Sequence, residues 1–196
     1  MRNWYFKPSG TLSVAILALS CAAFSGAYAA AHLKGYARNC IEANELCVWH
    51  KAVVAPPKGW IEDEGWTTRY QRLTLFENGD KSSDKPLIYL RAHRGDNALV
   101  LEDYIRVAQK RWRENAVKSS IEALPDFERK GKPAFKVYLY KNPAIPDQAF
   151  ELTAFTKDVD AEHPQETYFF QAVLSSPSME EVERAKPAFY ELLSKL

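Results

Sequence analysis

The chain has 196 residues, of which 46% are hydrophobic and 26% are charged, and its formal net charge is +1. This composition is too apolar for a disordered chain and too polar for a bundle of membrane helices, so we expect one globular domain. The near balance of charge also excludes the basic surplus that is typical of nucleic-acid-binding proteins.

The first residues have the pattern of a secretory signal peptide. Arg2 and Lys7 precede an apolar run over residues 12–23, which gives way to small residues over 27–29. We expect cleavage after Ala29 and a mature chain that is periplasmic or secreted. Cleavage removes two of the 26 basic residues and none of the 25 acidic ones, which leaves 24 against 25 and a net charge of −1.

Two alternatives for this segment stay open. If the segment is retained, the protein is a membrane-anchored structural protein, although a span needs roughly 20 apolar residues and Pro8, Gly10 and Gly26 interrupt this one. The other alternative is a lipid anchor at Cys21, but Ala18 stands where a bacterial lipobox usually has Leu.

Removal of the signal peptide leaves two cysteines, Cys40 and Cys47, in an oxidising compartment. We therefore predict a disulfide between them, which staples an N-terminal segment over residues 30–58. The alternative is a metal site that adds His50, with or without His32. The six-residue gap between the cysteines fits no common zinc spacing, so we expect no metal and no cofactor.

Residues 59–196 carry the periodicities of the main domain. Alternating apolar and polar residues over 70–76 predict a strand that ends at the turn over 78–80, and the apolar run over 87–92 predicts a second strand. The period then changes and predicts an amphipathic helix over 99–116. Its apolar positions recur at steps of four, three and four, at Leu101, Ile105, Ala108 and Trp112.

Three further runs, over 134–140, 149–157 and 167–175, predict strands whose short connections favour antiparallel neighbours. The chain then closes on a predicted helix, because Ser178 and Glu181 have the spacing of a capping box. The helix carries one continuous apolar stripe, formed by Val182, Ala185, Phe189, Leu192, Leu193 and Leu196.

Pro187 lies inside this stripe, and the unbroken period predicts a kinked helix rather than two helices. The order of the elements, strands and a helix followed by more strands and a terminal helix, predicts the α+β class. We expect a largely antiparallel sheet covered by helices.

This order of elements resembles that of the PsbP-like superfamily, which includes an extrinsic protein of photosystem II and small exported bacterial proteins. The resemblance covers residues 52–196 and is carried by the Pro-Lys-Gly-Trp entry over 57–60, the mid-chain helix with Trp112 and the closing helix over 189–196. It implies an α-β-α sandwich that serves as a binding or accessory module, with no shared catalytic residues.

No catalytic motif accompanies this pattern. The sequence has no Gly-x-Ser-x-Gly, no His-Glu-x-x-His and no glycine-rich phosphate loop. An alternative function is an envelope hydrolase built on the acidic cluster over 158–166. This cluster contains Asp158, Asp160, Glu162, His163 and Glu166, and a solvated loop between two strands explains the same residues.

Aromatic residues near the start of the domain are the strongest candidates for a binding surface. Trp60 and Trp66 lie beside glycines and acidic residues, and Tyr70 follows them. Large aromatic rings on a solvent-exposed loop are suited to anchoring a partner, although such rings can equally fill a hydrophobic core. We therefore expect a binding or accessory module of the cell envelope rather than an enzyme, with another envelope protein or a small ligand as its partner.

Overall fold

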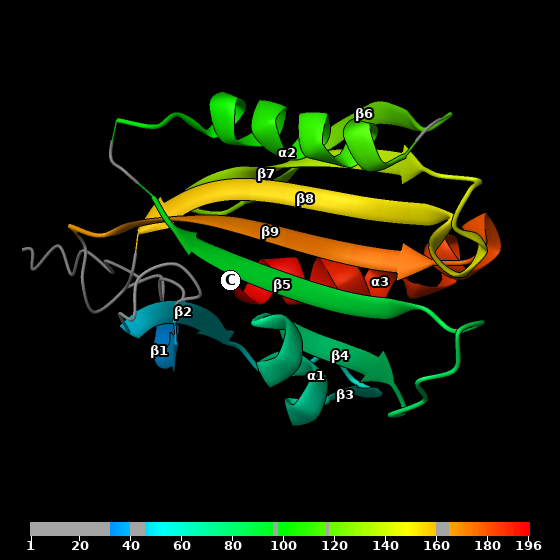
Figure 1. Ribbon diagram of the computed structural model, residues 1–196, viewed down its shortest axis with the longest axis horizontal. Helices are drawn as coiled ribbons and strands as arrows, with labels where there is room; N and C mark the ends of the chain where they lie inside the picture. The colour runs from blue at the N-terminus through cyan, green and yellow to red at the C-terminus, as the bar shows by residue number, and fades with distance from the viewer. Residues whose placement is uncertain (1–31, 40–45, 96–97, 117, 160–164) are drawn as a thin grey trace, which may run out of the picture.

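The computed structural model describes residues 32–39, 46–95, 98–116, 118–159 and 165–196 (Figure 1). The predicted signal peptide, the predicted disulfide partner Cys40 and most of the acidic cluster lie outside these residues. Within the described residues, we find no helix with the length and apolar character that a membrane crossing requires.

One large antiparallel sheet dominates the fold. Its strands are β1 (His32–Asn39), β2 (Leu46–Val53), β3 (Trp60–Glu62), β4 (Leu73–Glu77), β5 (Leu87–Arg94), β6 (Ser120–Arg129), β7 (Lys132–Lys141), β8 (Phe150–Val159) and β9 (Thr167–Ser176). The strand order is β1-β2-β5-β9-β8-β7-β6, and β4 joins from the side by pairing with β3 and β5. Every pairing is antiparallel.

In the described part of the chain, three helices accompany the sheet: α1 (Glu64–Tyr70), α2 (Leu101–Asn115) and α3 (Met179–Lys195), with a short 3-10 turn over Pro146–Gln148. The α+β prediction and the antiparallel sheet are thus confirmed. Each helix lies against part of the sheet only. The α3 helix contacts β8 and β9, α2 contacts β8, and α1 contacts β4.

The main core lies between α3 and one face of the sheet. Side chains alternate between the two faces of a strand, and on this face the positions are apolar. Ile88 and Leu90 of β5, Leu174 of β9 and Leu152 of β8 are all buried there. In Figure 1 this face is turned away from the viewer, and parts of α3 are visible behind the strands.

The terminal helix forms as its sequence predicts. The hydroxyl of Ser178 accepts a hydrogen bond from the backbone N–H of Glu181 at 3.2 Å, which caps the first turn. All six residues of the predicted apolar stripe are buried. Pro187 lies on the exposed side, inside one helix that runs to Lys195.

The predicted strand over 70–76 begins too early, because its first residue closes helix α1. Asp63 caps this helix by accepting from the backbone N–H of Trp66 at 2.8 Å, and Gln71 ends it in a left-handed conformation with φ of 53°. The buried hydroxyl of Thr67 then accepts from the N–H of Thr74 at 3.1 Å, which ties the helix to β4.

Among the described residues, four strands have no counterpart in the predicted elements: β1 and β2 in the N-terminal segment, the short strand β3, and β6. The hairpin of β1 and β2 joins the main sheet where His50 pairs with Ala92. Strand β6 is the outermost strand beyond β7, contains Pro125, and changes register on either side of Phe127. Its side chains are exposed or only half-buried, so it lacks the apolar signal of a strand.

We expect Phe189→Ala to lower the free energy of unfolding by about 3 to 5 kcal/mol. The ring is fully buried between α3 and the sheet, so its removal leaves a cavity. Thermal or urea unfolding of the mature protein measures the loss. Glu183→Ala, at an exposed position of the same helix, is the control and should change the value by less than about 0.5 kcal/mol. Equal stability of the two variants would contradict the packing described here.

Candidate functional site

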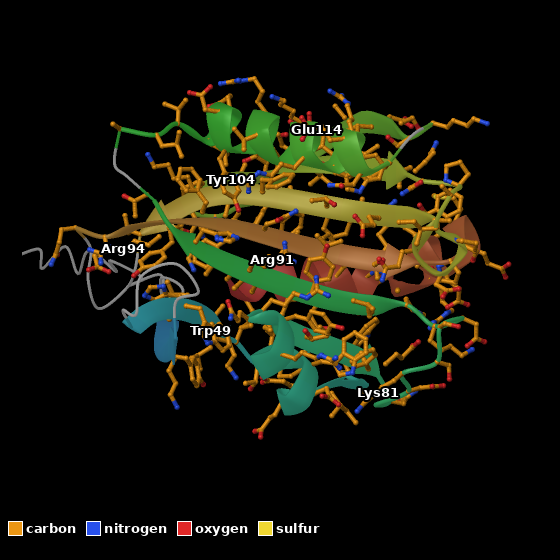
Figure 2. All side chains as sticks on the ribbon, in the orientation of Figure 1. Trp49, Lys81, Arg91, Arg94, Tyr104 and Glu114 are labelled. Carbon is orange, nitrogen blue, oxygen red and sulfur yellow. The ribbon has the colours of Figure 1, made fainter. Side chains whose placement is uncertain are left out.

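A groove runs between α2 and the face of the sheet that is turned away from α3. Its volume is about 490 Å³, and α2, β5, β7, β8 and β9 supply residues to it. Small-molecule sites commonly have volumes of roughly 300 to 1,000 Å³. In Figure 1, β5 is seen between α2 above and α1 below, and Figure 2 shows Arg91 over β5 and Tyr104 between α2 and the sheet.

The floor of the groove follows from the alternation of β5. Because Ile88, Leu90 and Ala92 are buried in the main core, the intervening side chains of Tyr89, Arg91 and His93 must point to the opposite face. Strand register extends this floor into β9, where Gln171 pairs with Arg91 and Phe169 pairs with His93.

The wall formed by α2 is aromatic. The ring of Tyr104 stacks on Phe169 with 4.6 Å between centroids, and the ring of Trp112 meets Tyr140 edge-on at 4.9 Å. Ile105 anchors the helix, since it is buried against Tyr140 and Phe155. One side of this wall therefore packs on the sheet, while Tyr104 and Trp112 also line the groove.

Glu151 of β8 lines the groove close to Trp112 and Tyr140. Burial raises the pKa of its carboxyl to about 7, although the positive charges of Arg72 and Arg91 pull the pKa down. Its neighbours in the register are Ser175 of β9 and Tyr140 of β7. A carboxyl group with this pKa changes its charge near neutral pH, as groups at functional sites often do.

Several polar atoms on this face are buried and make no hydrogen bond of good geometry among the described residues, although Ser175 lies close enough to Glu151 to lower its pKa. They are the hydroxyl oxygens of Ser175, Tyr140 and Thr153 and Nε of Arg72. The first two flank Glu151 across the neighbouring strands. Of these four residues, Tyr140 lines the groove, and because buried polar atoms are usually paired, its hydroxyl beside Glu151 is suited to contact a polar ligand group or water.

Arg72 lies against Tyr89, a residue of the groove floor. Its guanidinium lies over the ring of Tyr89, 3.6 Å from the centroid. Burial lowers the pKa of Arg72 and raises the pKa of Tyr89 well above its ordinary value. This cation and ring hold each other in place, since a guanidinium is attracted to the face of an aromatic ring.

Three arginines line the groove: Arg91 from β5, Arg94 from the end of β5 and Arg111 from α2. Arg94 is paired with Glu166 at 2.9 Å. Within the described part of the chain, the guanidinium groups of Arg91 and Arg111 form neither a salt bridge nor a hydrogen bond, and Arg91 only approaches the ring of Tyr89 at 5.4 Å. Glu151 is the one acidic residue among those that line the groove.

Arg91 and Arg111 line the same groove as His93 and Tyr104, and the charges of both arginines act on these two residues. Loss of water around its ring lowers the pKa of His93, and the positive charges of both arginines lower it further. Burial raises the pKa of Tyr104 to about 12, against the effect of the same two charges. At neutral pH, His93 and Tyr104 are therefore uncharged.

The aromatic residues predicted to form a binding surface lie elsewhere. The ring of Trp60 is only 6% exposed and belongs to the main core. Trp66 is half-buried against Phe76, with centroids 5.3 Å apart, and lies 5.0 Å from the ring of Tyr70, which is 42% exposed. Trp60 is therefore not accessible to a partner, while binding through Trp66 and Tyr70 stays a prediction.

The acidic cluster is only partly described. Asp158 pairs with Arg129 at 3.3 Å, with both side chains almost fully buried, and Glu166 pairs with Arg94 and accepts the hydroxyl of Tyr168 at 2.6 Å. Asp160, Glu162 and His163 lie outside the described residues. Within the described ranges, no three His, Cys, Asp or Glu side chains are grouped so that they could hold a metal ion.

Sequence reasoning missed the groove, although two signals for it were present. Arginine and histidine occupy alternate positions of the apolar strand β5, and Glu151 interrupts the apolar run of β8. Comparison of the chain with protein-family models, with curated proteins and with solved structures found no match. The site is therefore interpreted from its own geometry.

We expect Glu151→Gln to stabilise the protein at about pH 8 by about 1 to 3 kcal/mol. The folded state raises the pKa of this carboxyl from 4.5 to about 7, so folding binds a proton between these two values. Its unfavourable contribution is therefore absent below about pH 4.5, grows as pH rises, and is complete above about pH 7.

Urea unfolding of both proteins across this range measures the difference. The glutamine variant removes the titrating group but keeps its shape, so the gain should vanish near about pH 4. A difference that does not depend on pH would contradict the raised pKa.

We expect Gly95→Ala to destabilise the protein by about 1 to 3 kcal/mol. Gly95 lines the end of the groove, and an added Cβ would collide with the ring of Phe169. Because Phe169 stacks on Tyr104, the collision should also change the near-ultraviolet circular dichroism of these rings. Unchanged stability together with an unchanged spectrum would show that Gly95 is not close to Phe169.

Proposed function

We propose that this chain is a binding or accessory module of the cell envelope, and that a small ligand occupies the groove between α2 and the sheet. The export pattern of the first 29 residues supports a periplasmic or secreted location. The nearly balanced charge argues against nucleic acid as the partner.

The observation that carries this proposal is the combination of groups in one groove. Aromatic rings line it, two arginines enter it without an acidic partner among the described residues, and a half-buried carboxyl with a pKa of about 7 lies at one end. Pockets of this size with a few convergent polar groups and a perturbed pKa are the usual form of a ligand site.

The arrangement of the helices is consistent with the PsbP-like α-β-α sandwich that the sequence resembles. Helix α3 packs on the face that holds Leu90 and Leu152, and α2 packs on the face that holds Tyr140 and Phe155. We propose that the chain shares this layered architecture and the accessory role of such modules. The groove is then the space that remains between α2 and this face of the sheet.

A fluorescent apolar probe tests whether the groove takes a ligand. We expect phenylnaphthylamine, an uncharged aromatic molecule, to bind the mature protein with a rise in fluorescence. Val107→Trp should weaken this binding roughly tenfold or more, because ligand sites bury most of a small ligand and an indole at this exposed position on the groove wall would fill the space.

Lys110→Trp is the matched control, since it places the same ring on α2 outside the groove and should leave binding unchanged. Trp66→Ala tests the other candidate surface. If Trp66→Ala abolishes binding while Val107→Trp does not, the ligand uses the surface around Trp66 and Tyr70. If the unmodified protein does not bind the probe, the groove is not a ligand site.

A further inference from the structure

We infer that the groove selects aromatic organic anions, with the acidic group of the ligand held between Arg91 of β5 and Arg111 of α2 and its ring against Tyr104. This inference rests on the proposed function and names the chemical class of its ligand. It is carried by the charges that line the groove and by the elements that present them.

The positive charge of the groove is only partly balanced by the protein. Arg94 is neutralised by Glu166, and Arg91 acts on the buried carboxyl of Glu151, but within the described residues neither Arg91 nor Arg111 forms a salt bridge. Helix α2 carries two other arginines. Arg106 pairs with Asp103 at 2.7 Å, and Arg113 is exposed. Arg91 and Arg111 are distinguished by lining the same cavity.

The two arginines come from opposite walls. Arg91 rises from the floor, in register with Gln171, and Arg111 comes from the helix above the floor. Both arginines line the same cavity as His93 and Tyr104, so a ligand group in this cavity can approach both guanidinium groups. Two guanidinium groups that converge in a partly buried groove favour a carboxylate, sulfonate or phosphate, which accept hydrogen bonds from both.

The aromatic part of the ligand is indicated by the neighbouring rings. Tyr104 is stacked on Phe169 and is also 5.9 Å from the ring of His93, while Ala108 leaves room one turn further along α2. A planar ring can lie beside these groups by offset or edge-on contact. Trp112 extends the same wall toward Glu151, whose carboxyl would repel an anionic group when it is ionised.

Paired probes that differ in charge test this selectivity. Anilinonaphthalene sulfonate carries a sulfonate, whereas phenylnaphthylamine has nearly the same rings and no charge. We expect the mature protein to bind the sulfonate more tightly. Arg91→Gln and Arg111→Glu should each weaken binding of the sulfonate roughly tenfold, since hydrogen bonds to charged groups contribute strongly, and should leave the uncharged probe within about twofold.

Arg113→Glu is the matched control for Arg111→Glu, because it makes the same change of charge on the same helix outside this groove. Added salt should weaken the sulfonate more than the uncharged probe in the unmodified protein. Thermal melts of each variant identify any that fail to fold, and Arg111→Glu, at an exposed position, should melt as the unmodified protein does.

The outcomes separate the two proposals. If both probes bind equally and the two arginine changes have no effect, while Val107→Trp still blocks binding, the groove is a ligand site without anion selectivity and this inference is wrong. If neither probe responds to Val107→Trp, the proposed function itself is wrong. If Arg113→Glu weakens the sulfonate as much as Arg111→Glu does, the effect is general surface charge and the inference is also overturned.

Discussion

The packing of α3 against the sheet is the constraint on which the rest of the structure depends. The helix buries Phe189, Leu192 and Leu193 against one face, and burial of such side chains provides most of the stabilisation of a small domain. Because the side chains of Ile88 and Leu90 point to that face, the alternation of β5 directs Tyr89 and Arg91 to the opposite face. The composition of the groove is therefore a consequence of how the opposite face is packed.

The groove also has an energetic cost within the protein. Two guanidinium groups without acidic partners among the described residues repel each other, and buried hydroxyl groups that lack partners lose their hydrogen bonds to water. Around Glu151, Ser175 and Tyr140 the chain keeps polar groups where apolar ones would pack more stably. Proteins that retain such groups commonly use them in binding, because a ligand can supply the missing partners.

The regular central elements could be predicted from the sequence. Helices α2 and α3 and strands β5, β7, β8 and β9 follow the expected boundaries closely, because each carries a strong apolar period and is buried on at least one side. Helix α1 was not predicted, since seven residues are too few to show a helical period and its stability comes from the Asp63 cap and the Thr67 contact with β4. The exposed strand β6 gives no apolar period at all.

The candidate site was harder to predict than the fold. Each groove residue is an unremarkable polar or aromatic residue in its own segment, and only the strand order brings β5 and β8 to either side of β9. The aromatic residues that stand out in the sequence were assigned to the surface, but Trp60 fills the core. Sequence spacing shows which face a side chain takes within one element, but it does not show which elements share that face.

Strand β6 forms an irregular outer edge of the sheet. A straight outer strand offers a row of free N–H and C=O groups on which a strand from another molecule can add, and fibres can grow by repetition of that step. Here Pro125 removes one donor and two changes of register break the row. Two acids of the strand are paired within the sheet, Glu122 with Lys141 and Asp126 with Lys136. A second copy would therefore meet mismatched hydrogen bonds at this edge, which disfavours the joining of two sheets there.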